Sequence, residues 1–131
     1  KLLATARTTP TVVVANEATE AVRARLRTRG AGLIEIGSSG LHGALRALAD
    51  RGLLDVLCEG GPTLAGELLV AGLIDRVLFF VAPLIVGRGA PDLFATPAAT
   101  AISEAWRLRD VEWSRVCNDL MLSGTIVPSE A

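Results

Sequence analysis

The run Leu54–Leu64 combines residue types that could bind an anionic ligand: an apolar segment ends on Glu59, breaks at two glycines and resumes at Pro62. We interpret it as a buried strand followed by a helix with proline in its first turn. The first N–H groups of a helix have no intrahelical acceptor, and the helix dipole favours negative charge there. Glycines let a ligand approach the backbone without a Cβ in the way. The run therefore predicts a phosphate site.

Two structural interpretations of this run remain open beside the functional one. The turn could be an ordinary strand-to-helix connection, and its spacing is not the GxGxxG fingerprint of a standard Rossmann fold. Thr63 favours an anion site, because its hydroxyl and its N–H could both reach the ligand. Glu59 would lie at the carboxyl end of a strand, where ligands gather in open α/β sheets. Its carboxylate could contact a ligand or cap neighbouring backbone N–H groups.

Other residues with chemical potential are weaker candidates. His42 is the sole histidine and has no paired nucleophile, so we interpret it as a surface residue and do not expect Ser-His-Asp chemistry. Arg88, between two glycines of a loop, is a less favoured phosphate candidate. Trp106 and Trp113 are interpreted as core or interface anchors rather than as a stacking platform.

Four arginines lie at alternate positions of one predicted helix, at residues 23, 25, 27 and 29. On a helix they fan out, and only Arg23 and Arg27 share a face. A solvated face is the favoured interpretation, with a contact to a nucleotide phosphate as the alternative.

Composition bounds the class of protein. The chain has 131 residues, of which 50% are hydrophobic and 21% charged, which is typical of one well-filled domain. A net charge of -1 argues against a nucleic-acid binder with a basic surface. The longest apolar run, Val77–Val86, contains Pro83 and is shorter than the roughly 20 residues that span a membrane. Cys58 and Cys117 form no CxxC or Cys/His cluster, so we expect no metal site and two buried free thiols in a reducing cytoplasm.

The predicted elements alternate between strand and helix before the rhythm changes. Strands are predicted at Thr11–Ala15, Leu33–Ile36, Leu54–Cys58 and Val77–Val81, the last continuing towards Val86. Helices are predicted at Glu17–Arg29 after an Asn16 cap, from Ser38–Gly40 to Gly52, and at Pro62–Ala71. This alternation favours an α/β fold with a parallel sheet. An antiparallel hairpin follows, with strands Trp106–Val116 and Leu120–Val127 around Asn118-Asp119.

Four ordered motifs carry a family resemblance: Glu59–Leu64, Gly72–Asp75, Ala82–Gly87 and Pro91–Phe94. Together they resemble the reductase domain of bacterial riboflavin biosynthesis, the pyrimidine reductase family with a dihydrofolate-reductase-like fold. The resemblance extends to the terminal hairpin and so covers nearly the whole chain. It implies a three-layer α/β fold with a mostly parallel sheet and a C-terminal antiparallel hairpin.

The resemblance also implies a function and a site. Family members reduce 5-amino-6-(5-phosphoribosylamino)uracil to the ribitylamino product with NADPH, and they tend to be cytoplasmic homodimers. Glu59 would face the substrate, and no residue is assigned to the hydride step. The resemblance suggests a cis peptide bond between Gly60 and Gly61. The residues implied to line the NADP phosphate site are Gly60, Gly61, Pro62, Thr63, Leu64 and Ala65.

The chain also departs from the family pattern. Members begin with a substrate-binding strand and a long stretch before the segment that corresponds to Lys1. We therefore expect residues 1–131 to be the C-terminal portion of a reductase domain that is not catalytically complete alone. Two alternatives remain: a related NADPH reductase of a pterin-like or pyrimidine substrate, and a non-catalytic scaffold that binds no cofactor. A plain phosphate- or nucleotide-binding α/β module is a weaker third.

Overall fold

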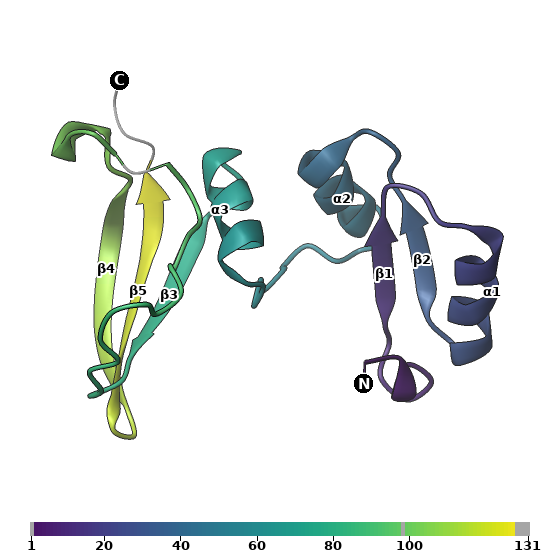
Figure 1. Cartoon of the computed structure of the whole chain (residues 1–131), viewed down its shortest axis with the longest axis horizontal. Helices are drawn as coiled ribbons and strands as arrows, with labels where there is room; N and C mark the ends of the chain where they lie inside the picture. The colour runs from purple at the N-terminus through teal and green to yellow at the C-terminus, as the bar shows by residue number, and fades with distance from the viewer. Residues whose placement is uncertain (1, 98, 128–131) are drawn as a thin grey trace. The chain divides into compact units, whose positions relative to one another are not determined.

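A computed structural model describes residues 2–97 and 99–127 of the chain. The chain divides into two compact units, Lys1–Leu57 and Cys58–Ala131, which we call the N-terminal unit and the C-terminal unit. Figure 1 shows that each unit combines helices with its own sheet. We describe them in turn.

The N-terminal unit is built around a parallel strand pair. Strands β1 (Val12–Ala15) and β2 (Gly32–Glu35) pair in parallel, and helix α1 (Glu20–Arg29) connects them. A short 3₁₀ turn, η1 (Leu2–Ala4), precedes this β-α-β unit, and helix α2 (Gly40–Ala49) follows it. Parallel neighbours need such a crossover connection, so the predicted alternation of strand and helix is confirmed here.

The core of the N-terminal unit is small and apolar. Leu26 of α1 is 4% exposed and packs with Ala6 and Ala31, while Leu3 and Leu33 are partly buried against this cluster. The i, i+4 spacing of Val22 and Leu26 predicts that both face inward; this is confirmed for Leu26 and wrong for Val22, which is 44% exposed. The spacing of four residues of α2 predicts one apolar face, and the structure has that face half-buried: Leu41, Ala44, Leu45 and Leu48.

Helix α1 begins three residues later than predicted. Thr19, rather than Asn16, is the N-cap, and its hydroxyl accepts a hydrogen bond from the N–H of Val22. The backbone of Thr19 is extended (φ -72°, ψ 157°), and the N–H of Ala18 before it donates to a carboxylate oxygen of Glu35 at 2.8 Å. This bond joins residues 17 positions apart, so a local pattern could not reveal it.

The C-terminal unit joins one helix to an antiparallel sheet. Helix α3 (Pro62–Val70) is followed by β3 (Arg76–Val81), β4 (Arg107–Val116) and β5 (Asp119–Val127), with the strand order β3-β5-β4. The 3₁₀ turn η2 (Ile102–Glu104) precedes β4. The predicted hairpin is confirmed almost to the residue. The pairing of β3 is antiparallel, so the parallel arrangement does not extend to this strand.

Buried side chains of this unit come from α3, β3 and β5. Leu68 and Leu69 of α3 and Val77 of β3 are its buried apolar residues, and Ser123 of β5 is also buried. Phe79 of β3 meets Phe94 edge to face, with ring centroids 6.2 Å apart. Aromatic pairs in this geometry add to the stabilisation from burial.

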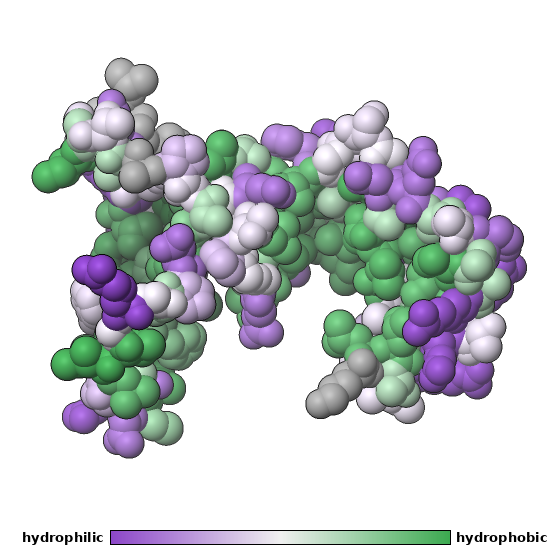
Figure 2. All heavy atoms as spheres, viewed as in Figure 1, coloured by the Kyte–Doolittle hydropathy of each residue, from purple (hydrophilic) through white to green (hydrophobic). Residues whose placement is uncertain are grey.

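The strand predicted at Leu54–Cys58 is not formed, so that prediction is wrong. Residues 53–61 carry no regular structure, and no N–H of residues 54–60 donates a backbone hydrogen bond to a described residue. Leu54 is 81% exposed. An apolar run signals that burial is favourable, but a strand also needs a neighbour to pair with. Figure 2 shows how widely apolar side chains reach the surface of the chain.

The architecture agrees with the fold class expected from the sequence. The chain is an α/β protein with a parallel pair of strands and a three-stranded antiparallel sheet that contains the C-terminal hairpin. Within the described ranges, every helix is too short or too polar to cross a lipid bilayer.

Candidate cofactor-binding site

The predicted phosphate turn forms the start of α3. Gly61 is the N-cap in an extended conformation (φ -69°, ψ 177°), and Pro62 takes the first helical position. The N–H of Ala65 donates to the carbonyl of Gly61 at 3.1 Å. The N–H groups of Thr63 and Leu64 have no acceptor among the residues the structure describes. This helix end therefore offers unpaired donors and an exposed Thr63 hydroxyl to an anion.

The two glycines of the turn have different surroundings. A Cβ built on Gly61 would meet no heavy atom of the described residues within 4 Å, so no steric contact with them requires glycine there. A Cβ on Gly60 would lie 2.8 Å from Cδ2 of Leu64, so the exposed Leu64 side chain would have to shift. Gly61 thus leaves open space in front of the helix, as close approach of a ligand to the backbone requires.

The peptide bond between Gly60 and Gly61 is trans, since the described residues contain no cis peptide bond. The cis linkage expected from the family resemblance is therefore wrong for this structure. Trans is the low-energy state of a peptide bond between two non-proline residues. Here the extended Gly61 leads into α3 without a cis linkage.

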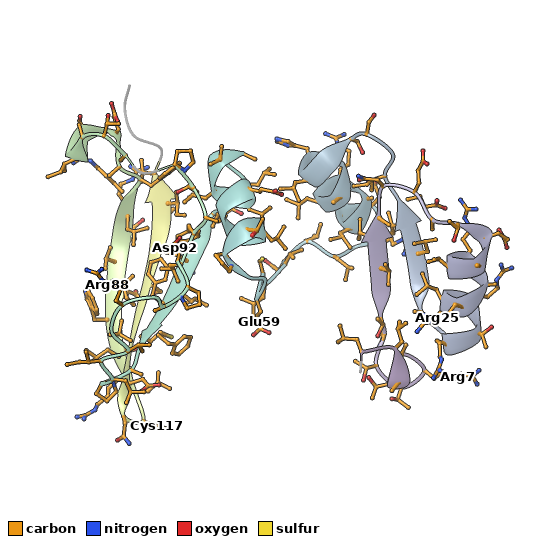
Figure 3. All side chains as sticks on the ribbon, in the orientation of Figure 1. Arg7, Arg25, Glu59, Arg88, Asp92 and Cys117 are labelled. Carbon is orange, nitrogen blue, oxygen red and sulfur yellow. The ribbon has the colours of Figure 1, made fainter. Side chains whose placement is uncertain are left out.

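Glu59 lies in the exposed segment directly before α3, as Figure 3 shows. Its carboxylate accepts no hydrogen bond and forms no ion pair with a described residue. The alternative that Glu59 caps neighbouring N–H groups is therefore not observed. The carboxylate is available to a ligand.

The weaker candidates from the sequence are His42, Arg88 and the two tryptophans. His42 is exposed on α2, as predicted for a surface residue. Arg88 lies in the irregular segment after β3, and Figure 3 shows it apart from Glu59. Trp113 is 62% exposed, so it is not a core residue of the C-terminal unit, and Trp106 is more sheltered.

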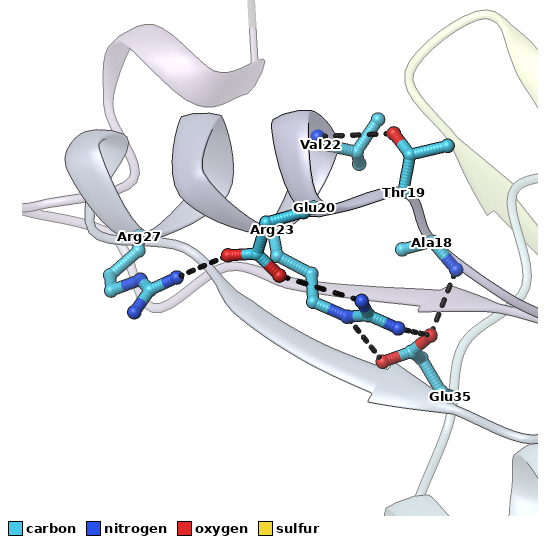
Figure 4. Close-up of polar contacts among 7 residues, drawn as sticks. All are labelled: Ala18, Thr19, Glu20, Val22, Arg23, Arg27 and Glu35. Carbon is cyan, nitrogen blue, oxygen red and sulfur yellow. Dashed lines mark hydrogen bonds and ion pairs between the residues drawn. The ribbon is translucent and has the colours of Figure 1, made fainter.

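Two of the four arginines of α1, Arg23 and Arg27, contact carboxylates of the N-terminal unit (Figure 4). Arg23 forms two hydrogen bonds with Glu35, at 2.8 and 3.0 Å, and contacts Glu20 at 3.5 Å. Arg27 also contacts Glu20, which confirms that these two arginines share a face. The hydrogen bond from Arg23, aided by the N–H of Ala18, lowers the pKa of Glu35 below its ordinary value of 4.5.

This network was not found from the sequence, although a strand ending on a carboxylate, Glu35 of β2, was a readable signal. The other two arginines, Arg25 and Arg29, line a shallow hollow beside Leu2, Leu3 and Ala4. The arginine helix therefore serves the fold of its own unit at Arg23 and Arg27.

The prediction of two buried thiols is wrong, because Cys58 and Cys117 are both exposed. Cys58 falls in the segment that forms no strand, and Cys117 lies in the β4–β5 turn with a positive φ of 55°. Within residues 2–97 and 99–127, no group of three or more His, Cys, Asp or Glu residues could hold a metal ion.

Residues 1–122 match the family model described as the RibD C-terminal domain. A riboflavin biosynthesis protein RibD from Mycobacterium tuberculosis is 45% identical over 82 residues, which cover 60% of this chain and 22% of the relative. A chloroplastic riboflavin biosynthesis protein PYRR from Arabidopsis thaliana is 29% identical over 118 residues, covering 89% and 20%. The chain thus spans about a fifth of the length of these curated relatives.

Solved structures of two proteins are also similar to this chain. Acinetobacter baumannii RibD is similar with a TM-score of 0.74 and 25% identity, over 88% of this chain and 31% of that protein. A pyrimidine reductase-like protein from Corynebacterium diphtheriae is similar with a TM-score of 0.62 and 22% identity, over 88% and 50%. At that identity the second likeness supports the fold alone. These structures agree with the dihydrofolate-reductase-like fold expected from the sequence.

Proposed function

Because this chain belongs to the RibD C-terminal domain family, we propose that it forms part of an NADPH-dependent reductase of riboflavin biosynthesis. The substrate would be 5-amino-6-(5-phosphoribosylamino)uracil and the product its ribitylamino counterpart. The match of the family model over residues 1–122 is the observation that carries the proposal.

The start of α3 is the proposed binding site for a phosphate group of NADPH. The N–H groups of Thr63 and Leu64 lack acceptors among the described residues, and Gly61 leaves open space before them. A phosphate there would also gain from the positive end of the helix dipole. NADPH, when bound, supplies the hydride, while the protein binds and orients. The full proposed set is Gly60, Gly61, Pro62, Thr63, Leu64 and Ala65.

Glu59 is proposed to face the substrate. Its uncommitted carboxylate could accept hydrogen bonds from the polar groups of the uracil derivative. It could also oppose positive charge that develops at the carbon–nitrogen bond being reduced.

Titration of the chain with NADPH tests the cofactor site. We expect saturable binding and at least about tenfold weaker binding by Gly61→Val, a loss equal to about one hydrogen bond to a charged group. The added side chain meets no protein atom near its Cβ, so it obstructs the ligand rather than the fold. Val70→Thr, at the exposed far end of α3, is the matched control and should bind like the parent chain.

Two results would redirect this proposal. Unchanged affinity in Gly61→Val would place the cofactor elsewhere. No saturable binding by the parent chain would favour the alternative of a non-catalytic scaffold.

Turnover tests the substrate side. The rate of NADPH oxidation is measured with the authentic substrate in a catalytically active form of the protein. This rate should fall in Glu59→Gln, while the Kd for NADPH stays constant. Equal kinetics in the two proteins would remove Glu59 from the reaction. Oxidation of NADPH in the presence of a pterin, but not of the uracil derivative, would support the alternative of a related reductase.

The proposal also includes a cytoplasmic homodimer. Exposed apolar residues of the C-terminal unit, among them Phe80, Leu84 and Ile85, support self-association, since large apolar patches commonly mark interfaces. Sedimentation measures the size in solution, and fractionation of producing cells measures the compartment. A monomer at high concentration would contradict the dimer.

A further inference from the structure

A backbone segment of the C-terminal unit lies directly on the first half of α3. Gly66 is buried, and a Cβ built on it would lie 2.7 Å from the carbonyl oxygen of Ala95 and 2.9 Å from its carbonyl carbon. Real Cβ atoms essentially never come so close to backbone atoms. Glycine at position 66 is therefore what allows the chain around Ala95 to rest on the helix.

The same segment reaches the first turn of the helix. The N–H of Ala95 donates to the carbonyl of Pro62 at 2.9 Å. The preceding residue, Phe94, meets Phe79 of β3 edge to face, at an angle of 82° between the rings. Phe94 and Ala95 thus connect the sheet to the start of α3.

The first turn of α3 needs such support. The helix is nine residues long, and helices of this length are marginal without tertiary contacts. Gly61 provides no side-chain cap, and Thr63 and Leu64 are exposed. The buried leucines, Leu68 and Leu69, lie in the second half of the helix. The hydrogen bond to Pro62 acts at the end where the candidate site lies.

We propose that Gly66, Phe94 and Ala95 are positioning residues that hold the first turn of α3 and thereby aim the N–H groups of Thr63 and Leu64. We call these three residues the clamp. The inference rests on the proposed function only in taking an NADPH phosphate as the ligand of those N–H groups. The clamp itself touches neither cofactor nor substrate.

The variant Gly66→Ala tests the clamp in the 131-residue chain. Alanine favours a helix interior over glycine, so propensity alone would make α3 firmer. We expect the opposite at the first turn, because the new methyl group displaces Ala95. The backbone ¹⁵N order parameters of Thr63, Leu64 and Ala65 should fall from about 0.85 towards about 0.6, those of β5 should not change, and the Kd for NADPH should rise about tenfold.

Two further variants make the result decisive. Phe94→Leu keeps an apolar side chain but removes the edge contact with Phe79, so it should loosen the same residues to a smaller extent. It carries the test if Gly66→Ala does not fold. Val70→Thr, exposed on the last residue of α3, should change neither order parameters nor affinity.

The outcomes separate the clamp from the proposed function. Unchanged order parameters at Thr63–Ala65 in Gly66→Ala and Phe94→Leu overturn the clamp, whatever happens to affinity. Lower order parameters with an unchanged Kd overturn its role in aiming the N–H groups at NADPH. If the parent chain binds no NADPH but its first turn loosens in the variants, the cofactor proposal fails and the clamp stands. Loosening that extends equally through β5 indicates general destabilisation and also overturns it.

Discussion

The two units of the chain are stabilised by different interactions. In the described residues, the ion pairs all lie in the N-terminal unit, where Arg23 and Arg27 engage Glu20 and Glu35. The C-terminal unit depends on an antiparallel ladder and buried apolar side chains, and its described side-chain hydrogen bonds join Thr100 to Glu104.

This difference bears on where a ligand can bind. A charged group already paired within the protein has little left to offer a ligand, because its partner must first be displaced. Arg23 and Glu35 are in that position. Glu59 and Thr63 of the C-terminal unit have no described partners and border the open N-terminus of α3. The unit with fewer described side-chain hydrogen bonds and ion pairs is thus the one whose polar side chains are available to a ligand.

The largest expected effect comes from removing one core leucine in each unit. Leu26→Ala and Leu69→Ala delete side chains that are 4% and 6% exposed, and each should cost its own unit about 2–4 kcal/mol. Amide hydrogen exchange should accelerate in β2 for the first variant and in β5 for the second. If either variant accelerates both strands equally, the units unfold together and the comparison between them loses its basis.

The second-largest expected effect is a loss of stability of each unit at acid pH. The hydrogen bond from Arg23 lowers the pKa of Glu35, and the hydroxyl of Thr100 lowers that of Glu104. A carboxyl with a lowered folded pKa stabilises the protein above its ordinary value of 4.5, and this contribution is lost as pH falls through the folded pKa. Both units should therefore weaken below about pH 4.5, through different carboxylates.

Two glutamine variants measure this acid response. Glu35→Gln should flatten the pH dependence of amide protection in β2 and leave that of β4 unchanged. Glu104→Gln should do the reverse, and each variant is the control for the other. A pH dependence in β2 that survives Glu35→Gln would show that another group controls the acid response of the N-terminal unit.

The sequence correctly predicted the elements that are determined by neighbouring residues in the chain. The β4–β5 hairpin and the start of α3 at Pro62 follow from alternation, turn residues and proline placement, and the structure has them where expected. The strand predicted at Leu54–Cys58 failed because an apolar run contains no information about its pairing partner. The start predicted for α1 at Glu17 was wrong, and the hydrogen bond from Ala18 to Glu35 could not be read from neighbouring residues.

The candidate site also has some features that neighbouring residues determine and others that depend on distant contacts. The helix N-terminus, the two glycines and Glu59 were readable, because each depends on neighbours in the chain. The contact between Gly66 and Ala95 was not, because it joins segments distant in sequence and leaves only an unremarkable glycine as its signal. The trans bond between Gly60 and Gly61 corrects an expectation that came from resemblance rather than from the residues themselves.

The smallest effect expected is that of salt, and it addresses the comparison most directly. In 1 M NaCl the screening length is about 3 Å, so exposed ion pairs lose most of their attraction while apolar burial does not. Amide protection should fall slightly in β2 and stay constant in β5. Glu35→Gln should remove the salt response of β2, because the pair it screens no longer exists. An equal change of amide protection in both strands would mean that the ion pairs of Arg23 do not stabilise the N-terminal unit.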